Sequence, residues 1–180
     1  EVGESTTLMA DANGAYDARQ AVQLGRRLEA LGLYWLEEPV VVEDLEGYAA
    51  VAGALDCYVA GSEGEYTRQG FRELLLRGKV DIAQPDLTRC GGLTEGLAIG
   101  LLASSLNRWF SPHCWSSVFG LAAAVHLTAA LPNGLTVEYD AHPNPLKDRL
   151  IPGQLQPQSG KLAVPSRPGL GLQVDESFME

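Results

Sequence analysis

The sequence predicts an α/β fold, a partial (β/α)8-type (TIM-like) barrel of about six strand–helix units. Short runs of apolar residues alternate with helix-like stretches, and a charged or imidazole side chain stands near the end of each run. These side chains recur every 23 to 27 residues. That interval fits one strand, one crossover helix and two short loops, which is the repeat of a parallel α/β fold.

Six apolar runs are the predicted strands. In chain order they span Thr7–Ala10, Leu33–Leu36, Cys57–Ala60, Val80–Ala83, Arg108–Ser111 and Leu135–Val137. The side chains near their C-terminal ends are Asp11, Glu37, Glu63, Asp86, His113 and Glu138. Functional groups of such barrels gather at the carboxyl ends of the strands, so we expect these six side chains to share one rim.

The segments between the strands have helical patterns. Apolar and small residues recur on one face of residues 18–31, where Asp17 is a favourable N-cap and Gly32 can end the helix. The other predicted helices span residues 68–77, 93–106 and 118–131. Helices between strands are the connections that a parallel sheet requires.

The predicted barrel is incomplete. Six units do not close an eight-stranded barrel, which takes about 250 residues, so we expect a fragment that lacks the first strands. Residues 1–140 hold the six units, and residues 141–180 are rich in turn residues but keep apolar side chains that can pack on a neighbouring element. Open sheet edges invite association, and we therefore expect a homo-oligomer.

Composition and charge exclude several classes of partner and site. A net charge of −10 without a cluster of Lys and Arg disfavours nucleic acid and anionic membranes. Three cysteines without C-x-x-C spacing argue against a disulfide framework and a structural zinc site. The sequence contains neither an apolar run of about 18 residues nor a signal-peptide pattern, so we expect a cytoplasmic protein.

Three of the strand-end residues form a candidate metal site. Asp11, Glu37 and Glu63 offer only carboxylate oxygens, which suit Mg²⁺. Without a cation, three carboxylates in one place would raise one another's pKa values by repulsion. A magnesium ion is therefore the predicted cofactor.

The next two strands supply a candidate acid–base pair. A carboxylate behind one ring nitrogen fixes the tautomer of an imidazole and makes it more basic, and Asp86 can do this for His113. His126 falls within a predicted helix and His142 within the turn-rich segment. We interpret these two histidines as structural.

Several short motifs resemble the mandelate racemase subgroup of the enolase superfamily, in the same order along the chain. They are Asp11-Ala12-Asn13, Trp35-Leu36-Glu37-Glu38-Pro39, Gly61-Ser62-Glu63, Gln84-Pro85-Asp86 followed by Gly91-Gly92, and Pro112-His113. The resemblance extends over nearly the whole chain. It implies that the present chain is the barrel part of a longer protein and that residues 141–180 pack on an N-terminal capping domain.

The resemblance also implies roles for individual residues. Asp11, Glu37 and Glu63 match the three magnesium ligands of the family. His113 and Asp86 match its catalytic dyad. Glu138 matches the acid that hydrogen-bonds the substrate carboxylate as it becomes an enediolate. Two further residues are placed beside these: Asn13 is expected to face the substrate, and Glu38 to support the site.

The implied reaction is removal of the proton α to a carboxylate. We favour dehydration of an acid sugar to a 2-keto-3-deoxy acid, because the sequence around His113 and Glu138 looks like that of acid-sugar dehydratases. A racemase or epimerase of a 2-hydroxy acid and a catalytically inactive truncated fragment remain alternatives. The sequence does not identify the sugar.

Two features depart from the family pattern. Ser62 stands where glycine often precedes the third ligand. The Lys-x-Lys strand that carries a second base has no counterpart, since Lys79 begins a predicted strand and Lys147 and Lys161 lie in the turn-rich segment.

Overall fold

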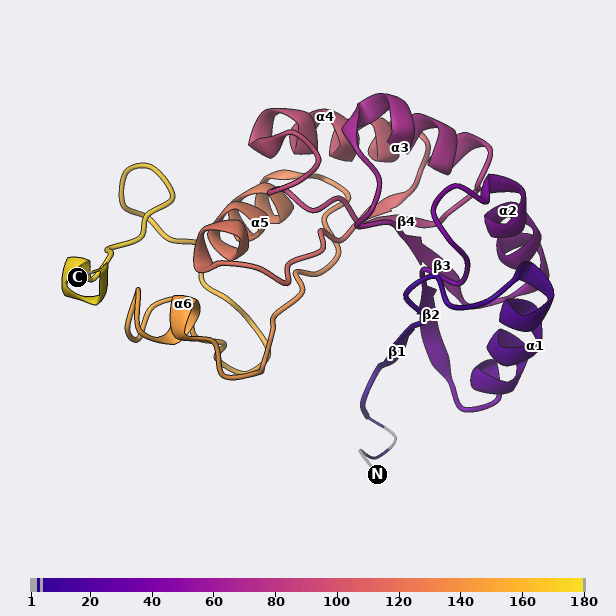
Figure 1. The fold of residues 1–180 in the computed structure, drawn as a ribbon, viewed down its shortest axis with the longest axis horizontal. Coiled ribbons are helices and arrows are strands. Elements are labelled where there is room, and N and C mark those ends of the chain that lie inside the picture. The colour runs from indigo at the N-terminus through magenta and orange to yellow at the C-terminus, as the bar shows by residue number, and fades with distance from the viewer. Residues whose placement is uncertain (1–2, 4, 180) are drawn as a thin grey trace.

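The computed structural model describes residues 3 and 5–179 and has the predicted α/β architecture. Five parallel strands form one sheet in the order β1-β2-β3-β4-β5. The sheet curves into an arc, with the helices on its outer side (Figure 1). The predicted class of fold is therefore confirmed.

Each strand is followed by a helix. The elements are β1 (Leu8–Asp11), α1 (Ala18–Glu29), β2 (Leu33–Glu37), α2 (Leu45–Ala54), β3 (Tyr58–Gly61), α3 (Thr67–Leu76), β4 (Ile82–Ala83), α4 (Gly92–Ser105), β5 (Trp109–Phe110), α5 (Val118–Ala130), the short α6 (Pro145–Asp148) and a 3₁₀ turn (Glu176–Met179). Register partners such as Asp11 and Glu37 in β1 and β2 bring the strand ends level with one another.

The sixth predicted strand differs from the other five. Residues 135–137 continue the arc beside β5 but form no ladder: the backbone pairs through one isolated parallel bridge between Phe110 and Gly134, in which Phe110 N–H donates to Asn133 C=O at 2.9 Å and Leu135 N–H donates to Phe110 C=O at 2.8 Å. Strand β5 has only two residues, so it offers little length for pairing.

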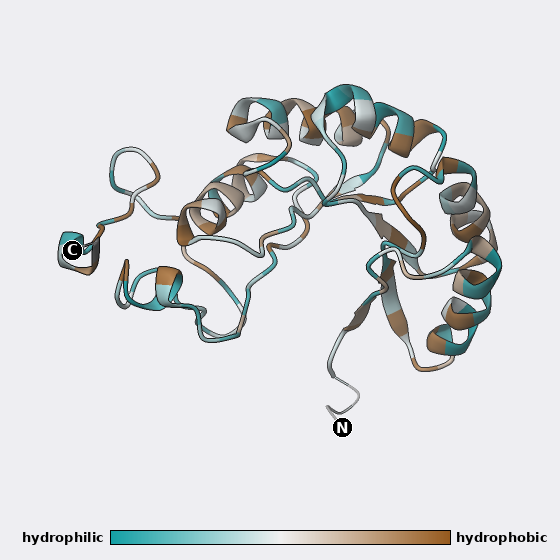
Figure 2. Cartoon of the chain, viewed as in Figure 1, coloured by the Kyte–Doolittle hydropathy of each residue, from teal (hydrophilic) through white to brown (hydrophobic). Residues whose placement is uncertain are grey.

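Helix α1 begins as the sequence predicts. Asp17 Oδ1 accepts the Gln20 N–H at 2.8 Å, and Gln20 Oε1 accepts the Asp17 N–H at 3.2 Å, which makes a reciprocal cap. Gly32 takes a φ of +79°, a conformation that favours glycine, in the turn before β2. Hydrophilic and hydrophobic residues alternate along this helix, as Figure 2 shows.

Helix α2 was not among the predicted helices. Its sequence, LEGYAAVAGA, is almost entirely small or apolar and so lacks the alternation of polar and apolar faces that marks a surface helix. The signal that was present is its N-cap: Asp44 Oδ1 accepts the Gly47 N–H at 2.8 Å.

The main core lies between the sheet and the outer helices. Its largest fully buried side chains include Leu36, Val59, Phe71, Ile99 and Phe110, which come from strands and helices across the arc. This packing fixes the positions from which the strand ends project.

Part of the segment 141–179 packs on α5. Leu150 and Ile151 are buried against Val118, with Leu172 and Phe178 beside them. The predicted contact of this segment with a capping domain stays a prediction. Across residues 3 and 5–179, no helix has the length and apolar character needed to cross a membrane.

Glu29 joins the end of α1 to the segment that leads into β3. Its Oε1 accepts the N–H groups of Asp56 and of Cys57, the latter at 2.8 Å, and its Oε2 lies 3.0 Å from Arg26 Nη1. Burial disfavours the charged carboxylate, but the two backbone N–H groups and Arg26 outweigh it and lower the pKa of Glu29.

We expect Glu29→Gln to lower the free energy of unfolding at neutral pH by about 1 kcal/mol, because a neutral amide accepts these bonds more weakly. The folded-state pKa lies below the ordinary value of 4.5, so this contribution is present above that pH and is lost as the pH falls through the folded-state pKa. Urea denaturation from about pH 7 to about pH 3 should show the parent and the variant converging in acid.

The matched control is Glu43→Gln, at an exposed glutamate between β2 and α2. It should change stability less than Glu29→Gln at neutral pH. A Glu29→Gln deficit that is constant across the pH range would contradict the role given to this carboxylate.

Candidate active site

The predicted site residues meet at the carboxyl end of the sheet. A cavity of about 270 Å³ is lined by Asp11, Asn13, Glu37, Glu63, Arg89, His113, Trp115 and Glu138. Six of the seven predicted site residues belong to this set, and the seventh, Asp86, lies behind His113. A second cavity of about 370 Å³ shares Asp11, Glu37 and Glu138 with the first and is also lined by Met9 and Trp35 of β1 and β2.

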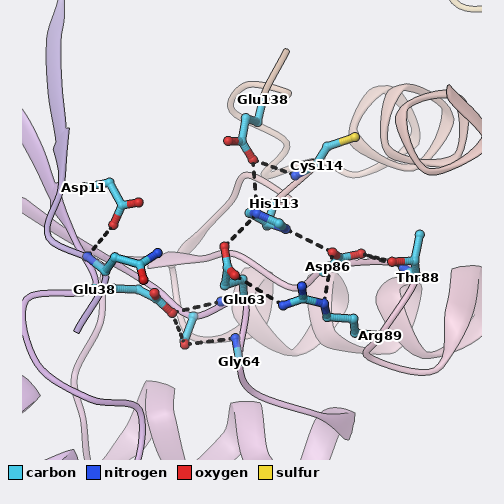
Figure 3. Close-up of polar contacts among 12 residues, drawn as sticks. Asp11, Glu38, Glu63, Gly64, Asp86, Thr88, Arg89, His113, Cys114 and Glu138 are labelled. Atoms are coloured by element: carbon cyan, nitrogen blue, oxygen red, sulfur yellow. Dashed lines mark hydrogen bonds and ion pairs between the residues drawn. The ribbon is translucent and has the colours of Figure 1, made fainter. Parts of the chain in front are cut away.

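His113 stands between carboxylates (Figure 3). Its Nδ1 lies 3.0 Å from Asp86 Oδ2, and its Nε2 lies 2.6 Å from Glu63 Oε2. Glu138 Oε2 is 3.8 Å from the same Nε2. The residue is 7% exposed, and Nε2 is the ring nitrogen that contacts residues lining the cavity, since Asp86 is not among them.

Asp86 is held in place by the loop that follows it. Its Oδ1 accepts both the N–H and the hydroxyl of Thr88, each at 2.7 Å, which leaves Oδ2 for the imidazole. Thr88 is not among the predicted site residues. Its position two residues after Asp86 is the signal that could have found it, since hydroxyl and N–H groups two residues on commonly bond a preceding aspartate.

The charges shift the pKa values of the pair in opposite directions. Burial lowers the pKa of His113, but the bond to Asp86 and the charges of Glu138 and Glu63 outweigh it and raise that pKa above its ordinary value. Burial raises the pKa of Asp86, and the bonds from His113 and Thr88 outweigh it and lower that pKa. Asp86 therefore stays ionised while it makes His113 a stronger base.

The three predicted metal ligands follow three neighbouring strands. Asp11 Oδ1 accepts the Asn13 N–H at 2.7 Å, and Glu37 Oε2 accepts the Trp35 Nε1–H at 3.1 Å. Glu63 Oε1 lies 3.2 Å from Arg89 Nη1. Burial, with the charges of Asp11 and Glu138, raises the pKa of Glu37 to about 7, against hydrogen bonds that lower it.

The donor set suits a hard cation, because all three side chains are carboxylates that line one cavity. Their side chains do not converge, however: within the described part of the chain, no three His, Cys, Asp or Glu residues are grouped so that they could hold a metal ion. Glu63 instead contacts His113 and Arg89. The magnesium ligands therefore remain a prediction.

Glu138 is fixed by the loop after β5. Its Oε2 accepts the Cys114 N–H at 2.6 Å, next to His113 in the sequence. Burial, with the charges of Glu138 and Asp86, raises the pKa of the Cys114 thiol to about 12. Cys114 therefore supports Glu138 through its backbone and not as a thiolate.

Glu38 and Ser62 form a support behind Glu63. Glu38 Oε1 accepts the Ser62 hydroxyl and also the Glu63 N–H, the latter at 3.2 Å. The Glu38 backbone bonds Gly14 at 2.8 Å and Ala60 at 3.0 Å, so this residue joins the segments that follow or end three strands. Ser62 is fully buried, and its departure from glycine adds a hydroxyl to this support.

Comparison with known proteins identifies the family of the chain. The model of the enolase C-terminal domain-like family matches residues 1–178. The chain belongs to this family. The resemblance to the enolase superfamily and its mandelate racemase branch is thereby confirmed.

The chain has similar sequence identity to two curated relatives. It is 35% identical to the arabinonate dehydratase of Saccharolobus solfataricus, over 99% of the chain and 48% of that protein. It is 36% identical to the D-galactarolactone cycloisomerase of Agrobacterium fabrum, over 99% of the chain and 49% of that protein. The chain thus spans about half the length of these relatives.

Solved structures share the fold. The 3,6-anhydro-D-galactonate cycloisomerase from Zobellia galactanivorans superposes with a TM-score of 0.91 at 39% identity, over 98% of this chain and 50% of that one. A mandelate racemase/muconate lactonizing enzyme from Sulfitobacter sp. superposes with a TM-score of 0.92 at 33% sequence identity, over 98% of this chain and 44% of that one. The arc of five strands is therefore similar to part of an enolase-superfamily barrel.

We expect Ser62→Ala to lower the free energy of unfolding by about 1–2 kcal/mol, because the half-buried Glu38 carboxylate loses the hydroxyl donor of the buried Ser62. Thermal or urea denaturation measures the change. The matched control is Ser105→Ala, since the exposed Ser105 hydroxyl donates to Leu102 C=O at 2.7 Å near the end of α4. Equal losses in the two variants would contradict the support role of Ser62.

Proposed function

We propose that the intact protein carrying this chain removes the proton α to the carboxylate of an acid sugar and eliminates water to give a 2-keto-3-deoxy acid. The observation that carries the proposal is the His113–Asp86 pair, which faces a cavity lined by carboxylates. The relatives support the substrate class, since they include a dehydratase of arabinonate and one of L-talarate and galactarate.

In the proposed reaction, His113 Nε2 accepts the α-proton. Asp86 accepts a hydrogen bond from Nδ1–H, which makes Nε2 the basic nitrogen on the cavity side, and Asp86 also stabilises the imidazolium that forms. Substrate would replace Glu63 at Nε2, since Glu63 Oε2 lies 2.6 Å from that nitrogen in this structure. The electrons of the broken C–H bond form the double bond of an enediolate. The β-hydroxyl then takes up the proton that His113 accepted and leaves as water, which restores the neutral imidazole, and the resulting enol rearranges to the keto acid.

The substrate carboxylate gains negative charge in this step, and the site must stabilise it. We propose that Asp11, Glu37 and Glu63 would hold Mg²⁺, which would supply positive charge beside that carboxylate. The raised pKa of Glu37 is consistent with this, because burial first and then the charges of Asp11 and Glu138 disfavour its ionised form, and a divalent cation would favour that form. Glu138 would hydrogen-bond the substrate carboxylate, and Asn13 would contact the substrate.

A second candidate is ring opening of a cyclic acid-sugar derivative. The cycloisomerases of Agrobacterium fabrum and Zobellia galactanivorans favour it, at 36% and 39% identity. The α-proton is again removed by His113, but the leaving β-oxygen stays attached as part of the same molecule. The product therefore distinguishes the two candidates, since cycloisomerisation releases no water.

The remaining expectations stay predictions. These are the partial barrel of residues 1–140, a segment 141–180 that contacts a capping domain, a homo-oligomer, and a cytoplasmic location. A small carboxylate is the partner that the proposed chemistry requires, and the negative net charge still disfavours nucleic acid and anionic membranes.

The test is a screen of aldonic and aldaric acids and their lactones with the intact protein and Mg²⁺ in D₂O. We expect a 2-keto-3-deoxy acid by NMR from at least one open-chain acid. His113→Asn should lower kcat by at least about 10²-fold, since it removes the general base. Asp86→Asn should lower it less, because the imidazole remains.

The control is His126→Gln. His126 lies in α5 and bonds Leu170 C=O at 3.2 Å, away from the cavity residues, so this variant should keep its activity. A lactone opened without loss of water would favour the second candidate. Full activity of a folded His113→Asn variant would contradict both.

A further inference from the structure

Trp115 is a large apolar side chain at the edge of a polar site. It lines the same cavity as His113 and Glu138, yet 55% of its surface is exposed, whereas His113 is 7% exposed. It stands two residues beyond His113 in the loop that leads to α5. Trp115 therefore lies farther out along the cavity than the proposed base.

The indole contacts another part of the chain. The Trp115 and His142 rings meet edge to face, with centroids 5.4 Å apart and planes at 64°. Asp140 Oδ1 accepts the His142 N–H at 2.8 Å and lies 3.1 Å from His142 Nδ1. One Asp140 oxygen therefore contacts both the backbone and the ring of His142 while that ring contacts Trp115.

The segment that carries His142 is itself anchored. Lys147 is buried and its ammonium donates to the carbonyl oxygens of Asp140 and of His142, the latter at 3.3 Å. The same Nζ lies 4.7 Å from the centre of the Tyr139 ring. Asn144 Nδ2 donates to Ser116 C=O at 3.4 Å, which ties this segment to the loop of Trp115.

The chemistry of the cavity wall matches a polyhydroxylated chain. An aromatic face packs well against C–H groups, because it removes apolar surface from water and its electron-rich face attracts their partial positive charge. Asn13 and Arg89 line the same cavity and offer hydrogen bonds to hydroxyl groups. A wall of this kind recognises carbon atoms beyond the two that react.

We propose that Trp115 is a specificity-determining residue that packs on the distal carbons of an acid-sugar substrate, with His142 as the residue that positions it. The proposal rests on the proposed function, because it assumes a carboxylate substrate whose α-carbon lies at His113. It adds a length requirement: acids with several carbons beyond the β-carbon gain from Trp115, and shorter 2-hydroxy acids do not.

The experiment measures Kd by calorimetry in the intact protein with Mg²⁺, in a His113→Asn background so that nothing is turned over. The probes are a panel of six-carbon aldonates and, as a short reference, glycerate. Adding Trp115→Ala should weaken the tightest aldonate about tenfold and leave glycerate unchanged. Trp115→Phe should restore most of the affinity.

The matched control is Trp109→Phe, at a tryptophan that is 39% exposed in β5 and lines neither site cavity. It should leave both Kd values unchanged. His142→Ala should weaken aldonate binding in the same direction as Trp115→Ala, by a smaller factor.

Equal losses for the aldonate and glycerate in Trp115→Ala would overturn the proposal, since they would show a structural role for Trp115. Unchanged aldonate binding would overturn it as well. These results leave the proposed function intact. If the His113→Asn protein with Trp115 intact binds none of the acids, that result would instead contradict the proposed function, and with it the role of Trp115.

Discussion

Burial of several carboxylates together at one end of a parallel sheet is the constraint on which the site depends. Asp11 and Glu37 end β1 and β2, Glu63 follows β3, and Glu138 lines the same cavity. Burial, with the charges of Asp11 and Glu138, raises the pKa of Glu37 to about 7. The negative charges of Glu63 and Glu138 have local partners. Arg89 lies beside Glu63, and the Cys114 N–H donates to Glu138.

The negative charge of the carboxylates around it also makes His113 useful as a base. Its ring is buried, which alone would keep it neutral, but three carboxylates favour the protonated form. Asp86 is the partner with a fixed orientation, because Thr88 occupies its other oxygen. The carboxyl end of the sheet thus carries the chemistry. At the opposite end of the strands, polar contacts such as the Glu29 bonds join helix to strand.

Much of this arrangement follows from the period of the sequence. The phase of the strand-end residues predicts the shared rim, because parallel strands in register bring equivalent positions together. The sequence signals for helix α2 and for the sixth strand were weaker. Helix α2 lacks an amphipathic pattern, and the last run pairs too briefly to form a strand. Arg89 and Trp115 lie on loops, where the strand–helix repeat does not predict which residues face the site. Each nevertheless follows a predicted site residue within three positions. The contact of Glu63 with His113 depends on side-chain rotamers, which a sequence pattern does not encode.

The central claim is that the carboxylates at the strand ends form one magnesium site beside the His113 base. Magnesium titration of the chain by calorimetry tests it most directly, with circular dichroism to establish that each variant is folded. We predict one binding event that Glu37→Gln and Glu63→Gln abolish and that Glu43→Gln preserves. A folded chain that does not bind magnesium, or that binds it equally well in all three variants, would contradict the claim.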